Sequence, residues 1–166
     1  MIILHLAFNG PYTDGYAYQD NLLPLKHKAF GYDVFIFCTT SIYDENKQIK
    51  HIKPSKYTDN NGIKVTRFKY KKLGVLSKKL RMVSGLYREI SNLSPDIIFV
   101  HGVQFWGLRT VLKYKKRNLN IKIYIDNHAD RINSEIKNLR HLFLNKYFYG
   151  IIARRFVPYT ERYWGV

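Results

Sequence analysis

Positions 126–130, directly after a β-branched apolar run, carry residue types that commonly do chemistry. Asp126, Asn127, His128 and Asp130 stand there together. Carboxylates beside an imidazole orient the ring and shift its pKa, so that the histidine exchanges protons near neutral pH. This crowding favours a functional role for His128. In the alternative interpretation, His128 is a satisfied core residue and Asp130 caps the helix that follows.

A second polar loop follows the first apolar run of the chain, MIILHLAF. It contains Asp14, Gly15 and Tyr16, just before a predicted helix. A glycine at a helix start permits the close approach of a phosphate, which the free N–H groups and the positive helix end attract. The alternative is an ordinary turn in which Asp14 is the helix N-cap. The loop has neither the GxGxxG nor the GxxxxGK[ST] pattern, which disfavours a standard dinucleotide or ATP site.

A third polar segment, with His101 and Gln104, follows the apolar run DIIFV. Ligands of open α/β sheets bind beyond the carboxyl ends of the strands, where the crossovers diverge to opposite faces. The three loops are therefore expected to open on one edge of a sheet. For His101, a functional role and a place in the core stay open as alternatives.

The sequence supports neither a metal site nor a hydrolase triad. It has no D-x-D pair, no H-E-x-x-H, no Cys/His ligand spacing and no G-x-S-x-G. The single cysteine, Cys38, lies inside the apolar run VFIFC. We therefore expect a buried thiol and no disulfide, which fits a reducing compartment.

The elements that must position these loops follow from the apolar periodicity. Short, continuous runs rich in Ile, Val and Phe are typical of strands covered on both faces, and they occur at residues 1–8, 33–40, 62–68, 96–102 and 122–128. Apolar spacing of three and four predicts helices at residues 16–30, 76–93, 103–117 and 131–153. This alternation predicts an α/β fold: a Rossmann-like, doubly wound, mainly parallel sheet with helices on both faces.

Two stretches lie outside this alternation. Residues 40–61 are polar with no clear period, which predicts a long loop. Residues 156–160, FVPYT, are expected to form a further short strand, followed by the start of a helix. At 166 residues the chain has the length of one domain. Because a doubly wound domain rarely ends at such a point, we expect residues 1–166 to be the N-terminal part of a longer protein.

The chain is strongly basic, with 28 Lys and Arg against 12 Asp and Glu and a net charge of +16. The positive electrostatic field of such a chain attracts phosphate-bearing partners. The segments 76–90 and 139–155 mix bases with large apolar groups, which favours peripheral contact with an anionic membrane. The alternative is that they are core-facing helices with lysines in water. No run is long enough to span a bilayer, and we expect a cytoplasmic protein.

A binding module for nucleic acid or another polyanion is the competing function. The cluster Lys113-Tyr114-Lys115-Lys116-Arg117 supports it. No recognised nucleic-acid motif is present, and clustered bases on one helix are commonly just solvated. We therefore expect no specific nucleic-acid partner.

Taken in order, these segments resemble the N-terminal domain of family 4 glycosyltransferases of the GT-B fold. The resemblance runs over essentially all 166 residues. It rests on the glycine-bearing loop in NGPYTDGYAYQDNLLPLKHKAFGYDVFIFCT, then GIKVTRFKY, then SPDIIFVHGVQFWGL, and then a strand that ends in IDNHAD. Where many members have a second glycine beside the first, this chain has Asp14-Gly15-Tyr16.

The resemblance implies one half of a two-domain GT-B enzyme. This half would bind the acceptor of a retaining transferase, and its own C-terminal domain would bind the nucleotide-sugar, a co-substrate used without cofactor or metal. His128 and Asp130 are then the candidate catalytic residues, with His128 at the transferred sugar or its phosphate. The family's second-domain residues are missing from these 166, so we expect the chain alone to be inactive.

The resemblance also implies roles for the other loops. Gly15, with Asp14 and Tyr16, would lie against the donor diphosphate, and His101, Gln104 and Asn127 would line the acceptor side. Family habit suggests a lipid-linked glycan acceptor in bacterial cell-envelope polysaccharide synthesis.

Overall fold

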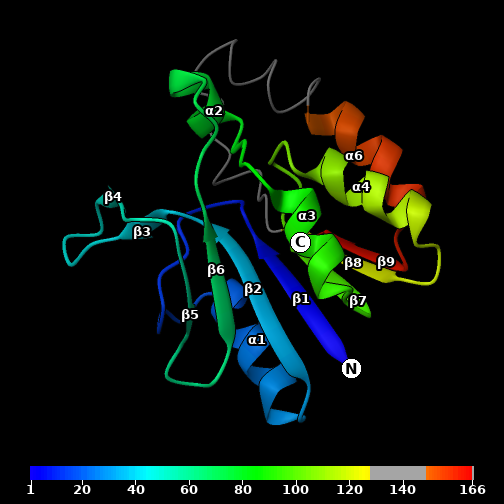
Figure 1. Cartoon of the computed structure of the whole chain (residues 1–166), viewed down its shortest axis with the longest axis horizontal. Coiled ribbons are helices and arrows are strands. Elements are labelled where there is room, and N and C mark those ends of the chain that lie inside the picture. Colours follow the sequence, from blue (N-terminus) through cyan, green and yellow to red (C-terminus); the bar gives the residue numbers. More distant parts are fainter. Residues whose placement is uncertain (128–148, 166) are drawn as a thin grey trace.

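A seven-stranded, mainly parallel sheet forms the centre of the chain (Figure 1). The computed structural model describes residues 1–127 and 149–165. The strand order is β5-β6-β2-β1-β7-β8-β9, and every neighbouring pair is parallel except β5 and β6. The strand bounds are β1 Ile2–Ala7, β2 Asp33–Thr39, β5 Ser55–Thr58, β6 Lys64–Phe68, β7 Ile97–His101, β8 Lys122–Asn127 and β9 Arg162–Gly165.

The order of the parallel strands is that of a doubly wound fold. From β6 to β9 it follows the pattern 3-2-1-4-5-6 of a Rossmann sheet. The chain first winds outward from β1 through β2 to β6, and it then returns to β7 on the other side of β1. The loops after β1 and β7 therefore open at the switch point, where such folds bind their ligands. The predicted α/β fold and its five strands are confirmed.

Helices cover both faces of the sheet (Figure 1). Helix α1, Gln19–Ala29, packs against β1 and β2 on one face. The helices α3 Leu86–Leu93, α4 Leu108–Arg117 and α6 Gly150–Phe156 lie on the other face. The predicted helix 131–153 falls mostly outside the described residues, and α6 contains its last part.

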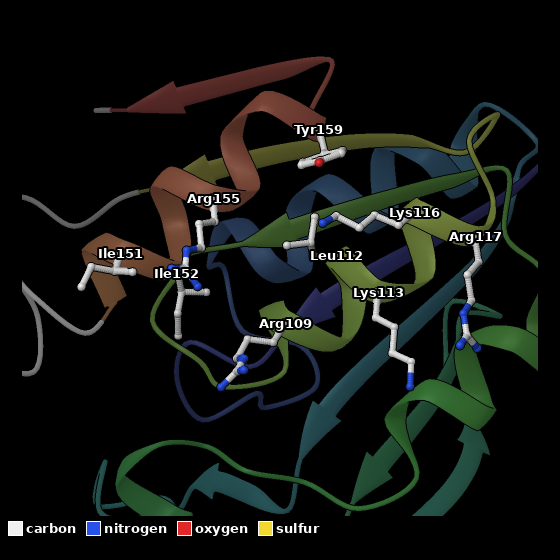
Figure 2. A pocket seen from close by; sticks show the side chains of 9 residues that line it. All are labelled: Arg109, Leu112, Lys113, Lys116, Arg117, Ile151, Ile152, Arg155 and Tyr159. Atoms are coloured by element: carbon white, nitrogen blue, oxygen red, sulfur yellow. The ribbon is translucent and has the colours of Figure 1, made fainter.

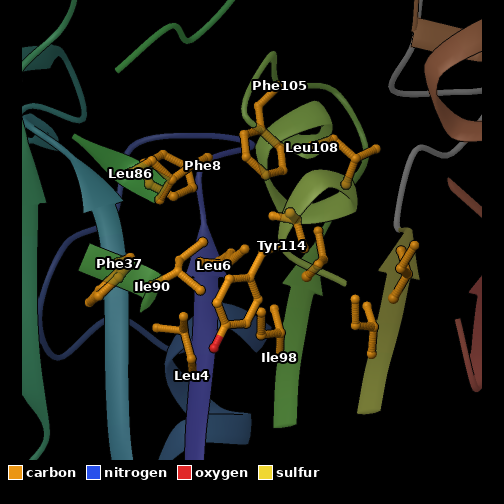
Figure 3. Close-up of a cluster of buried hydrophobic side chains, with 14 of the residues drawn as sticks. Leu4, Leu6, Phe8, Phe37, Leu86, Ile90, Ile98, Phe105, Leu108 and Tyr114 are labelled. Atoms are coloured by element: carbon orange, nitrogen blue, oxygen red, sulfur yellow. The ribbon is translucent and has the colours of Figure 1, made fainter. Parts of the chain in front are cut away.

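The main core lies between the sheet and α3, α4 and α6 (Figure 3). Successive strand residues point to opposite faces, so Leu4 and Leu6 of β1 face this core while His5 points to the α1 side. Phe8 and Phe105 stack with ring centroids 5.1 Å apart, and both are fully buried. These rings hold the loops after β1 and β7 against α4.

A smaller core lies on the α1 side and contains Val34, Ile36 and Cys38 of β2. Cys38 is a free, fully buried thiol. Burial raises its pKa to about 12, so the thiol stays protonated and unreactive. Its predicted place in the core is confirmed.

The predicted helix 76–93 is wrong as a single element. The chain forms α2, Gly74–Lys79, and then α3. Between them Arg81 has a φ of 50° and Gly85 a φ of 81°. Two residues in the left-handed region end one helix and start another, a change that apolar spacing alone does not reveal.

The predicted loop 40–61 contains three short strands. β3, Ser41–Tyr43, pairs antiparallel with β4, Ile49–His51, in a separate two-stranded sheet. β5 pairs antiparallel with β6 at the edge of the main sheet. β4 and β5 are largely exposed, and each of the three strands has only three or four residues, so none of them shows the apolar run of a covered strand.

The predicted strand 156–160 is also wrong, and so is the helix expected after it. Phe156 ends α6, and Val157–Tyr159 form a short 3-10 helix that contains Pro158. The strand comes later, as β9, which pairs with β8. Proline supplies no N–H group to a sheet and is common in a first helical turn, which accounts for the displacement.

Candidate functional site

The loops after β1 and β7 meet at Gly102, at the carboxyl end of the sheet. Gly102 has a φ of +76°, and a Cβ atom placed there would lie 2.5 Å from Nδ2 of Asn9. Only glycine fits such a close approach. The N–H group of Gly102 also donates to the carbonyl oxygen of Asp126 at 2.7 Å. The ends of β1, β7 and β8 therefore converge, as expected from the sequence.

His101 and Asp126 form a buried pair at this edge. They are partners in the register of β7 and β8, and Nδ1 of His101 lies 2.9 Å from Oδ2 of Asp126. The side chain of Gln19, at the start of α1, donates to the same oxygen at 3.0 Å. His101 is 4% exposed and Asp126 2%. The pair therefore lies at the base of the loops, beneath the surface.

Two further histidines extend this pair toward α1. Nδ1 of His5 lies 2.9 Å from Nε2 of His101, and Nε2 of His5 lies 3.0 Å from Nδ1 of His27. Sequence reasoning missed both residues, because His5 lies inside an apolar run and His27 in a helix. The signal that could have found them is strand alternation, which places His5 and His101 on the same face of neighbouring strands.

The surroundings of His5 and His27 favour neutral rings. Burial lowers the pKa of His5 well below 6.5, and interaction with His101 and then His27 lowers it further. Burial also lowers the pKa of His27, with a smaller effect from His101. A carboxylate, Asp126, lies only at the far end of this series, beside His101.

The glycine loop differs from its predicted form. α1 begins at Gln19 and Tyr18 is its N-cap residue, so Gly15 lies in the loop rather than at the helix start, and Asp14 is not the N-cap. Gly15 has a φ of +78° and open space on the side where a Cβ would stand. Asp14 accepts hydrogen bonds from the Tyr57 hydroxyl at 2.7 and 2.9 Å.

Arg67 links this loop to the sheet. Its side chain is 2% exposed and donates to the carbonyl oxygen of Tyr12 at 2.9 Å and to the Tyr57 hydroxyl at 3.0 Å. One of its nitrogens lies 3.4 Å from Oδ1 of Asp14. Burial raises the pKa of Tyr57, and the hydrogen bond to Asp14 raises it further with a smaller effect. This network fixes the loop in which Gly15 lies.

Tyr16 belongs to a cluster of three tyrosine rings. It stacks parallel to Tyr43, with centroids 6.2 Å apart, and Tyr18 lies against both rings at 5.7 and 6.5 Å. Tyr18 is 54% exposed. The cluster, which we call the tyrosine cluster, presents aromatic surface beside the glycine loop. Sequence reasoning missed Tyr43 because it lies in the segment predicted to be a loop.

Arg81 holds the backbone carbonyl group of Gln104 in place. The Arg81 guanidinium donates to the carbonyl oxygen of Gln104 and lies 3.5 Å from Oδ1 of Asn9. Burial lowers the pKa of Arg81. Arg81 thus brings a positive charge to the carboxyl edge between the loops after β1 and β7. Sequence reasoning missed this residue, because apolar spacing predicts one continuous helix across its segment.

The structure does not describe all of the residues on which the sequence-based hypothesis depends. His128 and Asp130 lie outside the described residues. The backbone of Asn127 pairs with Gly165 of β9, and its side chain is not described.

Of the predicted residues, His101 ends β7 and Gln104 lies in the loop that follows. Gly15 lies farther along the loop after β1, beside Leu25 of α1 and Asp59, and no hydrogen bond between described residues joins it to His101 or Gln104.

A basic groove of about 710 Å³ runs between α4 and α6, away from the sheet edge (Figure 2). Three apolar side chains, Leu112, Ile151 and Ile152, line it together with Tyr159. No carboxylate among the described residues forms an ion pair with its five cations, which are Arg109, Lys113, Lys116, Arg117 and Arg155. We call this the α4–α6 groove.

Neither a metal centre nor a membrane span is found in the described part of the chain. In residues 1–127 and 149–165, no group of three or more His, Cys, Asp or Glu side chains is arranged to hold a metal ion. None of the helices in these same ranges has the length and apolar character needed to cross a membrane.

Comparison with known proteins gives a match in structure alone. No protein-family model and no curated protein matches the sequence. The fold is similar to that of sucrose-phosphate synthase from Thermosynechococcus elongatus, with a TM-score of 0.57 and 12% sequence identity. The match covers 99% of this chain and 47% of that one, so the chain spans about half of the synthase. The chain therefore has a Rossmann-like, doubly wound fold similar to that of about half of the synthase.

Proposed function

We propose that this chain is the N-terminal, acceptor-binding half of a retaining, family 4 glycosyltransferase. The full enzyme transfers a hexosyl-type sugar from a nucleotide-sugar to a glycan acceptor, which we propose is lipid-linked and belongs to bacterial cell-envelope polysaccharide synthesis. The chain alone is inactive, because donor recognition lies in a C-terminal domain. The reaction uses neither metal nor resident cofactor.

One observation carries this proposal. The chain matches about half of a GT-B glycosyltransferase over nearly its whole length, and its polar loops gather at the switch point of the sheet, between β1 and β7. In doubly wound sheets this is where ligands bind. In a two-domain enzyme the same edge faces the cleft between the domains.

The loop residues take the following roles in the proposed enzyme. Gly15, between Asp14 and Tyr16, admits the donor diphosphate, since no atom of residues 1–127 and 149–165, its chain neighbours aside, lies within 4 Å of the position a Cβ would take. Arg81 offers positive charge at the same edge. His128 acts at the transferred sugar, and Asp130 is proposed as the second catalytic residue.

The acceptor side combines polar and aromatic groups. We propose that Gln104, in the loop after β7, and Asn127, at the end of β8, contribute polar contacts, and that His101, buried at the end of β7, supports them from below. The tyrosine cluster supplies aromatic surface on the neighbouring loop, where Tyr18 is 54% exposed. Sugar rings present apolar C–H surfaces that pack against aromatic faces, so the cluster suits a glycan better than a purely ionic ligand.

The α4–α6 groove supports contact with an anionic membrane. Five cations without a carboxylate partner among the described residues repel one another, and an anionic headgroup relieves that repulsion. Ile151, 51% exposed, and Leu112 offer apolar contact between the cations. This mixture is typical of surfaces that lie on membranes. A cytoplasmic enzyme that docks there meets a lipid-linked acceptor directly.

The same groove favours a second candidate function, a binding module for nucleic acid or another polyanion. Lys113, Lys116 and Arg117 lie on one helix and line the groove (Figure 2). Lys116 lies over Tyr159, whereas Lys113 and Arg117 point toward Tyr87 of α3. The two candidates differ in salt dependence and in the need for a second domain. Nucleic-acid binding weakens steeply with salt and survives in this chain alone.

The continuation of the gene after Val166 tests the two-domain proposal. We expect a further stretch of about 200 residues with alternating strands and helices, and with two acidic residues on one helix. A stop codon directly after Val166 would contradict the two-domain mechanism and favour the binding module.

A further inference from the structure

A continuous series of hydrogen bonds connects the carboxyl edge of the sheet with α1. It runs from Asp126 through His101 and His5 to His27, with contacts of 2.9, 2.9 and 3.0 Å. His5 is 0% exposed and His101 4%, whereas His27 is half-buried on α1. One end of the series thus reaches solvent, and the other lies under the loops of the candidate site.

Counting donors fixes the direction of every bond when no extra proton is present. An ionised Asp126 only accepts, so His101 donates from Nδ1 and keeps a lone pair on Nε2. His5 must then donate to that lone pair from Nδ1, and His27 must donate from Nδ1 to Nε2 of His5. All three rings are therefore Nδ1–H tautomers, and Nε2 of His27 is free to take a proton from water.

One added proton reverses the direction of the two bonds between the rings. His27 takes the proton on Nε2 and passes its Nδ1 proton to Nε2 of His5. His5 passes its own Nδ1 proton to Nε2 of His101. His101 then carries the charge beside Asp126, while His5 and His27 are neutral Nε2–H tautomers. No atom is gained or lost beyond the one proton, and the reverse sequence returns it to water.

We propose that Asp126, His101, His5 and His27 form a proton relay between solvent at α1 and the carboxyl edge of the sheet. Its role in catalysis rests on the proposed function: glycosyl transfer to a hydroxyl releases one proton at this edge. The relay lets the buried Asp126–His101 pair exchange a proton with solvent while substrates cover the loops. His5 and His27 touch no substrate and are therefore positioning residues.

Among the described residues that contact the relay rings, Asp126 alone carries a carboxylate. His5 faces His27 from α1 and His101 from β7, and Phe99 stacks on it with centroids 5.5 Å apart. His27 packs against Phe99 and the edge of Tyr32. Asp126 faces His101, and the neutral Gln19 donates to that carboxylate. Low pKa values at His5 and His27 keep these two rings neutral.

Tautomers of histidine are measured directly by long-range ¹H–¹⁵N correlation spectra, recorded on the ¹⁵N-labelled 166-residue chain across a pH titration. We expect Nδ1–H signals for all three relay rings at high pH. On acidification, His101 becomes doubly protonated, and His5 and His27 change to Nε2–H with the same midpoint. An Nε2–H tautomer of His5 at high pH, charging of His27 before His101, or no titration of the three rings would overturn the relay.

Two variants separate the relay from a purely structural role. His5→Phe keeps an aromatic ring in the stack but breaks the series, so we expect His101 and His27 to titrate independently. His51→Phe, on β4 outside the series, should leave the common midpoint in place. If His5→Phe does not fold, the wild-type titration alone decides. The spectra need no substrate, so an inactive full-length enzyme would reject the proposed function and leave the relay standing.

Discussion

Nδ1 of His101 lies 2.9 Å from Oδ2 of Asp126, and the two side chains are both almost fully buried. They are cross-strand partners at the carboxyl ends of β7 and β8. This pair ties together two of the three strands whose loops form the candidate site. Its strength therefore bears on both the stability of the sheet edge and the position of the loops.

Removing the buried carboxylate of Asp126 should lower the free energy of unfolding more than removing an exposed carboxylate. Asp126→Ala leaves a buried N–H of His101 without its acceptor, which costs about 1–3 kcal/mol in the free energy of unfolding. Asp33→Ala is the matched control, since it breaks the exposed Lys64–Asp33 pair at 3.1 Å, worth about 0–1 kcal/mol. Urea denaturation measures both. Equal losses would contradict a structural role of the buried pair.

Gly102→Ala should cost more stability than Gly15→Ala. Both glycines have nearly the same positive φ, +76° and +78°, so both variants carry a backbone cost of about 1–2 kcal/mol. At Gly102 alone, the new methyl group also meets Asn9 at 2.5 Å. The difference in unfolding free energy between the variants isolates this clash. If Gly102→Ala is no less stable than Gly15→Ala, the loops after β1 and β7 do not touch as described.

Stability should fall on acidification because of His5. In the folded chain, the pKa of His5 lies well below the ordinary 6.5. Below pH 6.5, the His5 imidazole therefore becomes protonated in the unfolded chain while it stays neutral in the folded chain. This contribution is fully present above pH 6.5 and is lost as the pH falls from 6.5 toward the folded pKa, with a slope of up to about 1.4 kcal/mol per pH unit.

The measurement is the unfolding free energy of wild type and His5→Phe at several pH values on both sides of 6.5. The variant lacks the titrating ring, so its stability should change less with pH. The same slope in both proteins would show that His5 is not the source of the acid sensitivity.

Charge reversal in the α4–α6 groove should weaken binding to anionic membranes. Each basic residue near such a surface contributes about 1 kcal/mol, so Lys113→Glu with Lys116→Glu should reduce affinity for phosphatidylglycerol vesicles by about 30-fold or more. The control, Lys50→Glu with Lys53→Glu, makes the same change in net charge at exposed positions elsewhere. Sedimentation with vesicles reports the bound fraction.

Three results would contradict groove-specific membrane binding. An equal loss in the control pair would mean that only net charge matters. Binding to neutral phosphatidylcholine vesicles as strong as to anionic ones would remove the role of the cations. Displacement of the protein from vesicles by duplex DNA, with tighter binding to the DNA, would favour the polyanion module.

The sequence was sufficient for the parts of the fold that rest on covered strands. β1, β2, β6, β7 and β8 are short, continuous apolar runs, and a run of this kind is typical of a strand that is buried on both faces. It was insufficient where structure depends on distant pairing. β5 forms only because β6 lies beside it, and β9 only because β8 does.

The place of the loops after β1 and β7 was predicted for a similar reason. The edge at which the loops gather follows from the rule for parallel strands, and His101 and Gln104 lie there. The partner of His101 could not be predicted, because the register that places it opposite Asp126 is a property of the folded sheet. His5 and Arg81 were missed since one lies in an apolar run and the other between two helices.

Sugar transfer by the full-length protein tests the central claim most directly. Purified full-length protein is mixed with a panel of nucleotide-sugars and a lipid-linked glycan acceptor, and nucleoside diphosphate release and the anomeric configuration of the product are measured. We expect release from at least one donor, retention of configuration, and no release by residues 1–166 alone. Failure to use any donor, or a product of inverted configuration, would contradict it.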